Sequence, residues 1–156
     1  MREILFRGMR IASGEWVEGY LFDDGIVNSK SVFIGNLAIT KYKGSADDEF
    51  EVGLDICEVI PETVGQYTGI ADINDKKIFE GDIVIDDGSR ILWVIGYDGY
   101  AFVAKDKRGR TYYSLFEHRQ YDLKAHAFTP LDHHYKVIGN IHDNPELLKE
   151  GGGSDA

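Results

Sequence analysis

Pairs of carboxylates are the most frequent pattern in this sequence that could carry out chemistry. They are Asp23 with Asp24, Asp47 with Asp48, and Asp86 with Asp87, and in addition Glu80 and Asp82 flank Gly81. Two neighbouring carboxyl groups can divide the roles of general acid and general base. All of these positions fall in segments typical of turns, where Asp side chains accept backbone hydrogen bonds. We therefore interpret them as turn residues, and a hydrolase that uses Glu80 and Asp82 is the weakest alternative.

Histidines and a single cysteine offer two other kinds of chemistry. His126, His133, His134 and His142 lie within 17 residues, but no pair has the spacing of recognised zinc sites. Cys57 stands in the apolar run ICEVI, where a thiolate is disfavoured. There is also no Gly-x-Ser-x-Gly elbow, Walker loop or dinucleotide fingerprint. The sequence therefore predicts no enzyme, no cofactor and no metal.

A basic turn close to several tyrosines is the pattern that suits nucleic acid. The turn carries Lys105, Lys107, Arg108 and Arg110, and the nearby tyrosines are Tyr97, Tyr100, Tyr112 and Tyr113. Aromatic rings can stack on bases while cations contact phosphates. However, aromatic residues that alternate along strands are more often core or subunit contacts. Nucleic-acid binding is therefore the alternative function rather than the leading one.

Charge and composition limit the classes of partner and compartment. The formal net charge is −10 at pH 7, which works against binding a polyanion. A lone cysteine cannot form an internal disulfide, which fits a reducing compartment. The first residues lack the apolar region of a secretory signal, and the longest apolar run is far shorter than the ~20 residues of a membrane helix. We expect a cytosolic protein with no membrane partner.

Short strands joined by glycine turns are the elements that must position these residues. With 18 Gly, nine Tyr, eight Phe and only three Pro, the composition favours strands over helices. The expected strands are 2–11, 15–22, two short ones within 26–42 broken near Gly35, 80–85, 90–97, 110–116 and 136–141. A polar loop is expected at 43–51, and Pro61 marks a boundary between sub-domains. Asn144 and Pro145 predict the start of a short C-terminal helix.

The segment from residue 90 to 105 predicts a hairpin that is apolar on both faces. Asp98-Gly99 is a signal for a two-residue turn. The cross-strand pairs that follow from it are Tyr97 with Tyr100, Ile95 with Phe102, and Trp93 with Ala104. Leu92, Val94, Ala101 and Val103 share the opposite face. One face should line a barrel, and the other needs cover from the N-terminal strands or from a neighbouring subunit.

Three blocks of sequence resemble the YopX family of bacteriophage and prophage proteins. They span residues 2–21, 59–84 and 135–148, and ETVGQYTG followed by IFEGDIV is the most specific part. The resemblance implies a mainly β fold with an SH3-like barrel, self-association, and an origin in phages of Gram-positive bacteria or prophages. It brings no catalytic residues. The positions most typical of the family are Thr63, Gly65, Gln66, Tyr67, Gly69, Glu80, Gly81 and Asp82.

Together these observations predict a mainly β chain (α+β at most). The expected parts are an N-terminal β sub-domain at 1–60, a small SH3-like β-barrel at 61–143, a short helix at 144–150 and a flexible tail at 151–156. The expected function is a non-enzymatic phage or prophage accessory protein in the bacterial cytoplasm. It should act as a homo-oligomeric interaction module, with an unidentified host or phage protein as a further partner. The candidate interaction surface comprises Thr63, Gln66, Tyr67, Glu80, Asp82, Tyr97, Tyr100, Lys105, Lys107, Arg108 and Arg110.

Overall fold

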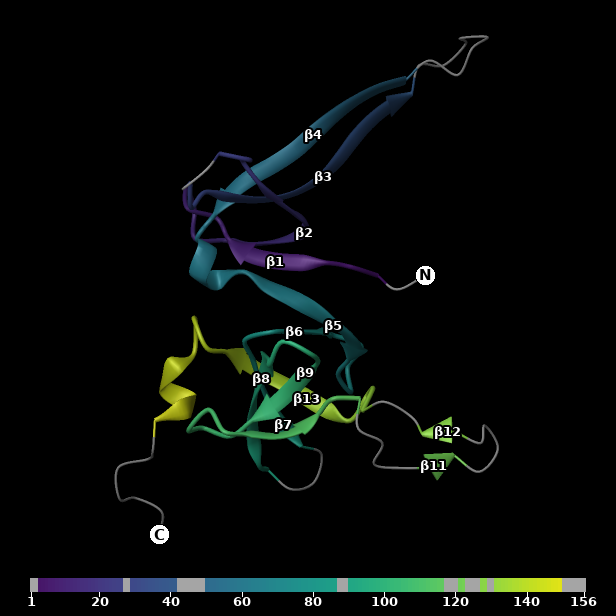
Figure 1. The fold of residues 1–156 in the computed structure, drawn as a ribbon, viewed down its shortest axis with the longest axis vertical. Coiled ribbons are helices and arrows are strands. Elements are labelled where there is room, and N and C mark those ends of the chain that lie inside the picture. The colour runs from purple at the N-terminus through teal and green to yellow at the C-terminus, as the bar shows by residue number, and fades with distance from the viewer. Residues whose placement is uncertain are drawn as a thin grey trace. The chain divides into compact units, whose positions relative to one another are not determined.

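The fold consists almost entirely of antiparallel β-strands (Figure 1). The structure, a computed structural model, describes residues 3–26, 29–41, 50–86, 90–116, 121–122, 127–128 and 131–149. The strands are β1 (Phe6–Met9), β2 (Trp16–Asp23), β3 (Val32–Lys41), β4 (Phe50–Val59), β5 (Gly65–Ala71), β6 (Lys77–Phe79), β7 (Asp82–Asp86), β8 (Leu92–Tyr97), β9 (Phe102–Lys105), β10 (Thr111–Ser114), β11 (Tyr121–Asp122), β12 (Ala127–Phe128) and β13 (Tyr135–Asn140). Two 3-10 turns, η1 (Pro61–Thr63) and η2 (Pro145–Leu148), are the helical elements of the described residues. The prediction of a mainly β chain is confirmed.

The chain divides into two compact units, and the division falls inside β5. Unit 1 comprises Glu3–Gln66, and unit 2 begins at Tyr67. Pro61, where the sequence places a junction, begins the turn η1 just ahead of β5. Within the part of the chain that the structure describes, no helix is long and apolar enough to cross a membrane.

Unit 1 is a sheet in which β4, β3, β2 and β1 follow one another, with the first two residues of β5 paired to β1. Its small core lies where β1 packs against the start of β3 and the end of β4, which we call the root of these two strands. Ile34 and Val59 are buried there at 1% and 0% exposure. A Cβ at Gly8 would lie only 3.0 Å from both of these side chains. Glycine therefore lets β1 approach the core closely.

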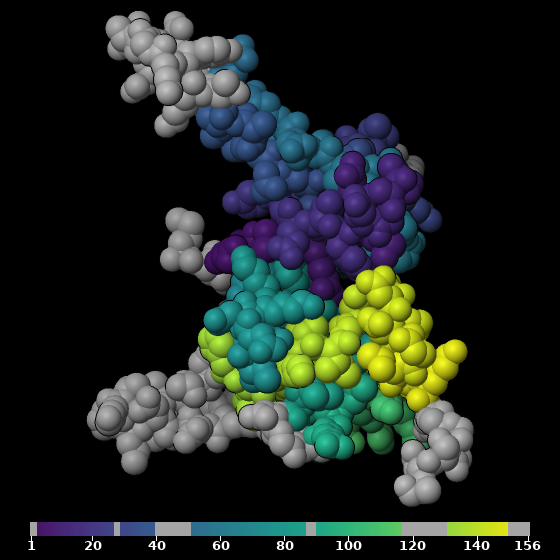
Figure 2. Space-filling view, turned by 180° about the vertical axis from the view of Figure 1, so that it is seen from behind, coloured from purple at the N-terminus to yellow at the C-terminus, as the bar shows by residue number. Residues whose placement is uncertain are grey.

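Strands β3 and β4 form a long two-stranded ribbon, which we call the arm. They pair without interruption from Val32–Val59 to Lys41–Phe50, and the blue strands stand out from the rest of unit 1 in Figures 1 and 2. The expected break near Gly35 is wrong, since β3 is one continuous strand. Gly35 serves a different purpose: a Cβ there would lie 2.1 Å from the carbonyl oxygen of Asp55. The predicted polar loop at 43–51 falls mostly outside the described residues.

Unit 2 is built on a sheet with the order β10-β9-β8-β7-β13. One face of that sheet carries the main apolar core, whose buried members are Ile70, Ile78, Val84, Trp93, Ile95, Phe102, Ala104, Leu115, Leu131 and Tyr135. Among the described strands, no backbone pairing joins β10 to β13 to close a barrel. The SH3-like character of this unit therefore stays a prediction.

The β8–β9 hairpin has the predicted faces but a different register. Tyr97 pairs with Phe102, and Ile95 pairs with Ala104, so the predicted pairs are wrong by two positions on one strand. The carboxylate of Asp98 accepts hydrogen bonds from the backbone N–H groups of Tyr100 and Ala101, both at 3.0 Å, which stabilises a four-residue loop. A shift of two residues leaves every side chain on its predicted face.

The second face of this hairpin is already covered within the chain. Gly96 and Val103 are buried, and Leu92 and Val94 are half-buried. The sequence left open whether the N-terminal strands or a neighbouring subunit cover this face, and its burial within the chain means that the hairpin does not by itself require a neighbouring subunit. Any case for self-association must come from another surface.

The C-terminal turn η2 is shorter than the predicted helix. Asn144 makes no side-chain cap to it, so the predicted cap is wrong. Instead, the Asn144 side-chain oxygen accepts a 3.3 Å hydrogen bond from the backbone N–H of Asn140. Leu147 and Leu148 are half-buried. The turn is thus tied back to the end of β13.

Candidate functional site

The turn between β6 and β7 holds the most unusual acidic pair, Glu80 and Asp82. Asp82 is 1% exposed, and its Oδ2 accepts a 2.8 Å hydrogen bond from the backbone N–H of Phe79. Gly81 adopts φ 89°, as a tight bend requires. The Gly81 N–H donates a 2.8 Å hydrogen bond to the carbonyl of Ile95, and the Gly81 carbonyl accepts a 2.9 Å hydrogen bond from the N–H of Ile141. The bend thus joins three segments of unit 2, and Asp82 fixes its shape.

The other positions typical of the family resemblance fall in both units. Thr63 and Gln66 belong to unit 1, and Tyr67 belongs to unit 2. The Thr63 hydroxyl donates to the carbonyl of Ile60 at 2.6 Å and accepts from the N–H of Met9 at 2.9 Å. The Tyr67 ring packs 5.7 Å from the ring of Phe79, with the ammonium of Lys77 at 5.2 Å from its centroid.

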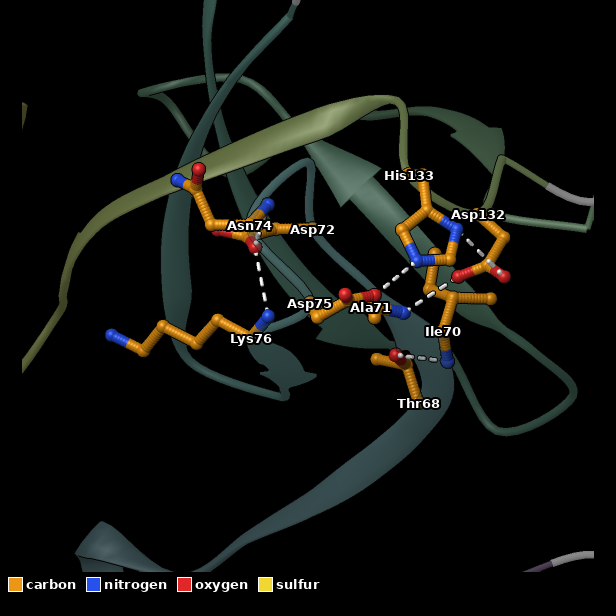
Figure 3. Close-up of polar contacts among 9 residues, drawn as sticks. All are labelled: Thr68, Ile70, Ala71, Asp72, Asn74, Asp75, Lys76, Asp132 and His133. Carbon is orange, nitrogen blue, oxygen red and sulfur yellow. Dashed lines mark hydrogen bonds and ion pairs between the residues drawn. The ribbon is translucent and has the colours of Figure 1, made fainter.

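A buried carboxylate organises the turn after β5 (Figure 3). Asp72 is 1% exposed, and its Oδ1 accepts from the backbone N–H groups of Asn74 and Lys76 at 2.8 and 2.9 Å. Its Oδ2 accepts from the N–H of Val137 at 3.1 Å. Burial on its own raises the pKa of Asp72, but these three hydrogen bonds and the nearby Lys76 outweigh it and lower that pKa.

His133 connects that turn to the segment before β13, as Figure 3 shows. Its Nε2 lies 2.7 Å from Oδ1 of Asp75, and its Nδ1 lies 3.2 Å from Oδ2 of Asp132. Asp132 in turn accepts the N–H of Ala71 at 2.7 Å. The hydrogen bond to Asp75, followed by the charge of Asp132, raises the pKa of His133. Because both partners are carboxylates, the network favours the imidazolium form.

The two adjacent histidines of this segment face different carboxylates. The imidazole of His134 contacts the carboxylate of Asp86 on β7, whereas His133 faces Asp75 and Asp132. His133 has φ 57°, a left-handed conformation that turns the chain between the two. In the described part of the chain, no group of three or more His, Cys, Asp or Glu side chains is arranged so that it could hold a metal ion. His126 lies outside the described residues.

A pocket of about 440 Å³ lies on unit 2 beside the basic turn. Its lining residues are Ile91, Leu92, Trp93, Asp106, Lys107, Arg108 and Tyr112. The rings of Trp93 and Tyr112 meet edge to face with centroids 5.2 Å apart. The pocket thus combines an aromatic and apolar wall with two cationic side chains.

Of the nearby tyrosines, the structure brings one to this pocket. Tyr97 ends β8 and Tyr100 lies in the loop that precedes β9, 47% and 95% exposed, whereas Lys107 and Arg108 follow the other end of β9. Tyr113 is half-buried, and its hydroxyl lies 2.5 Å from that of Tyr135. The side chain of Lys105 lies over Gly96: a Cβ built at Gly96 would come within 2.8 Å of the Lys105 Cε.

The arm of unit 1 presents an apolar face that the described residues leave exposed. Leu37 pairs with Leu54 and Ile39 with Val52, so these side chains share one face. Tyr20, Gly35 and Ile56 stand in the adjoining row of that face. The exposed fractions are 57% for Leu37, 54% for Ile39, 53% for Val52, 56% for Leu54, 38% for Ile56 and 55% for Tyr20. We call these six side chains the apolar face of the arm.

The opposite face of the arm has another character. It carries Asn36, Ala38, Gly53 and Asp55, all exposed. The arm is therefore amphipathic with both sides open, which is unusual because a sheet normally buries its apolar face.

Comparisons with known proteins identify the family. A family model described as YopX protein matches residues 5–149. The chain belongs to the YopX family. The crystal structure of protein EF1440 from Enterococcus faecalis is similar to this YopX chain, with 26% sequence identity and a TM-score of 0.57, over 96% of this chain and 100% of that one. No curated protein matches the sequence.

Sequence reasoning missed two features of this YopX-family chain. The apolar face of the arm is visible as the alternation VGLDI at 52–56, a pattern that indicates a strand with one apolar face. No pattern in the sequence indicated the pocket wall at Ile91 and Trp93. Whether Trp93 lies beside Arg108, 15 positions later in the chain, depends on the register of β8 and β9.

Proposed function

We propose that this YopX-family chain is a non-enzymatic accessory protein of a bacteriophage or prophage. It works in the cytoplasm of the bacterial host as a self-associating interaction module. The observation that carries the proposal is the apolar face of the arm, which six half-exposed apolar side chains form in unit 1. The family resemblance and the lack of a recognisable catalytic motif in the sequence support the same assignment.

The size of the apolar face suits a reversible contact. Burying a large apolar side chain completely contributes about 1.5–3 kcal/mol, so burying the exposed half contributes about 1 kcal/mol. A two-fold contact between two arms would bury twelve such side chains, or on the order of 10 kcal/mol. Association itself costs roughly 4–15 kcal/mol. We therefore expect a dimer whose population depends on protein concentration.

A second copy of the chain is the occupant that fits this face best. None of these six side chains is charged, and the exposed Glu18 and Glu58 stand at the margin of the same side. The rows of Leu37 with Leu54 and Ile39 with Val52 can meet the same rows of another arm across a two-fold axis. Asp55 lies on the opposite face, as does the exposed Glu51. Two arms that meet by their apolar faces thus keep these acidic side chains apart, which matters in a chain of net charge −10.

The test compares two neighbouring residues on β3. Leu37→Glu places a charge on the apolar face, and Ala38→Glu places the same charge on the opposite face. Both positions are exposed, so both variants should keep the fold, which circular dichroism and thermal unfolding check. Mass in solution, measured by light scattering over a wide range of concentrations, should show a dimer for the wild type and for Ala38→Glu, and a monomer for Leu37→Glu.

Two outcomes would overturn self-association. If the wild type stays monomeric at every concentration, the chain does not self-associate, and the apolar face would instead bind a different protein, of the host or of the phage. An equal loss of the dimer in both variants would show that added charge, and not the apolar face, controls assembly.

A further inference from the structure

We infer that the pocket of unit 2 binds a nucleobase that carries a phosphate group. The ring of the base would lie against the wall formed by Tyr112, Trp93 and Ile91, and the phosphate would meet Lys107 and Arg108. The inference is independent of self-association, because the pocket lies in unit 2 and the arm in unit 1.

The wall of the pocket is suited to a flat ring. Tyr112 is 56% exposed and Ile91 is 51% exposed, so both offer apolar surface to a ligand. Trp93 is 7% exposed, and its ring, set at 65° to that of Tyr112, holds the tyrosine in place from behind the surface. A supported aromatic ring is what base stacking requires, because an ordered ring loses little entropy on binding.

The cations beside the wall are held by a well-defined turn. The Asp106 carboxylate accepts hydrogen bonds from the backbone N–H groups of Arg108 at 3.0 Å and Arg110 at 2.8 Å. Gly109, with φ 80°, donates to the carbonyl of Asp106 at 2.9 Å. The backbone that carries Lys107 and Arg108 is therefore ordered before any ligand arrives.

Asp106, the carboxylate among the described residues that line the pocket, does not oppose an anion. Asp106 is engaged by the guanidinium of Arg110, with its Oδ2 at 2.8 Å from both Nε and Nη2. The turn from Lys105 to Arg110 contains four cations and one carboxylate, so its net charge is +3. Within a chain of net charge −10, this turn is a local positive site that can hold a phosphate.

The size of the pocket sets the size of the ligand. A volume of about 440 Å³ lies within the range of sites for small molecules. It suits one nucleotide rather than a long strand, and the acidity of the whole chain also disfavours extended contact with a polyanion. The nucleotide can be free in solution or can be one unit of single-stranded nucleic acid.

Titration with defined probes tests the inference. The probes are adenosine monophosphate, uridine monophosphate, adenosine, inorganic phosphate and a short oligothymidylate. Binding is followed by the NMR signals of the two indole N–H groups, Trp93 at the pocket and Trp16 in unit 1. We expect the nucleotides to shift the Trp93 signal and not the Trp16 signal, and adenosine or phosphate alone to bind more weakly than the nucleotides.

Matched variants separate the pocket from general surface effects. Tyr112→Ala and the double variant Lys107→Ala/Arg108→Ala should each weaken nucleotide binding by about tenfold, whereas Tyr112→Phe should keep it. Tyr100→Ala removes an exposed tyrosine elsewhere on unit 2, and Lys136→Ala/Lys149→Ala removes two exposed cations. Both of these controls should bind as the wild type does.

The outcomes decide both the site and the source of the ligand. Tighter binding of the oligonucleotide, with a steep dependence on salt, would assign the site to single-stranded nucleic acid. Equal or tighter binding of mononucleotides would assign it to free nucleotides. No binding of either class at low salt, or equal losses in the pocket and control variants, would overturn the inference.

Discussion

The imidazole of His133 lies 2.7 Å from the carboxylate of Asp75, although 58 residues separate them in sequence. This contact joins the turn after β5 to the segment before β13. Since Asp132 lies on the other side of the same ring at 3.2 Å, the imidazole is set between two acidic side chains. Charge on His133 therefore strengthens the junction between two distant parts of unit 2.

The titration of His133 is the first testable consequence. We expect its pKa to lie above the ordinary 6.5, chiefly because of the hydrogen bond to Asp75, and Asp75→Asn should lower it. Because folding raises this pKa, the stabilising contribution is complete below about pH 6.5 and is lost as the pH rises through the folded-state value. NMR titration of the ring protons measures the midpoint. An unchanged midpoint in Asp75→Asn would contradict this account.

Substitution of Asp72 should destabilise unit 2. An amide has a single acceptor oxygen, so Asp72→Asn cannot serve the N–H groups of Asn74 and Lys76 together with that of Val137. We expect a loss of about 1–3 kcal/mol, measured by urea unfolding. Asp98→Asn, in an exposed hairpin loop, is the control and should cost less. The pKa of Asp72 is lowered by folding, so its contribution should be present above pH ~3.8 and disappear as the pH falls through the folded-state pKa.

The role of Thr63 can be tested by two conservative changes. Thr63→Val removes the acceptor of the Met9 N–H and the donor to Ile60, and we expect it to cost about 1–3 kcal/mol. Thr63→Ser keeps the hydroxyl and should lose much less. Thermal unfolding of both variants distinguishes them. Equal stability of Thr63→Val and Thr63→Ser would contradict this role of the buried hydroxyl.

Two glycines of the arm should respond in opposite ways to alanine. At Gly35 a Cβ would lie 2.1 Å from the Asp55 carbonyl oxygen, whereas at Gly53 its nearest neighbour is an oxygen 4.0 Å away. Gly35→Ala should therefore destabilise unit 1 by roughly 1–3 kcal/mol, and Gly53→Ala should stay within about 0.5 kcal/mol of the wild type. Denaturant unfolding compares them. If Gly35→Ala left the free energy of unfolding unchanged, β3 and β4 would be able to separate at the root of the arm.

Local patterns in the sequence predict the elements well where neighbouring residues decide them. The alternation of Trp93, Ile95 and Tyr97 assigns the faces of β8 correctly, and Gly81 takes the bend expected of it. The register of the β8–β9 hairpin could not be obtained in this way. It depends on how the Asp98 side chain binds two backbone N–H groups, which enlarges the loop from two residues to four.

Contacts between residues far apart in sequence could not be predicted either, because they too depend on how the strands are arranged in the fold. Nothing near Asp75 in sequence indicates that His133 will approach it, since the contact depends on the hydrogen bonds between the segment before β13 and the end of β5, such as that from the His133 N–H to the Ala71 carbonyl. The pocket likewise needs Trp93 on β8 and Tyr112 on β10 to meet across the intervening strand β9. For the arm, alternation at 52–56 indicates one apolar face but not whether another part of the chain covers it.

The place of β7 in the sheet has a consequence for the synthesis of this protein. Its residues Ile83 and Val84 are completely buried, and its partners are β8 on one edge and β13 on the other. A nascent chain that has emerged only as far as β10 therefore carries an apolar strand with one edge still open, and open edges recruit other chains. Ribosomes stalled before residue 135 should release polypeptides that aggregate, and the interval needed to translate residues 115–140 is when a chaperone would have most effect.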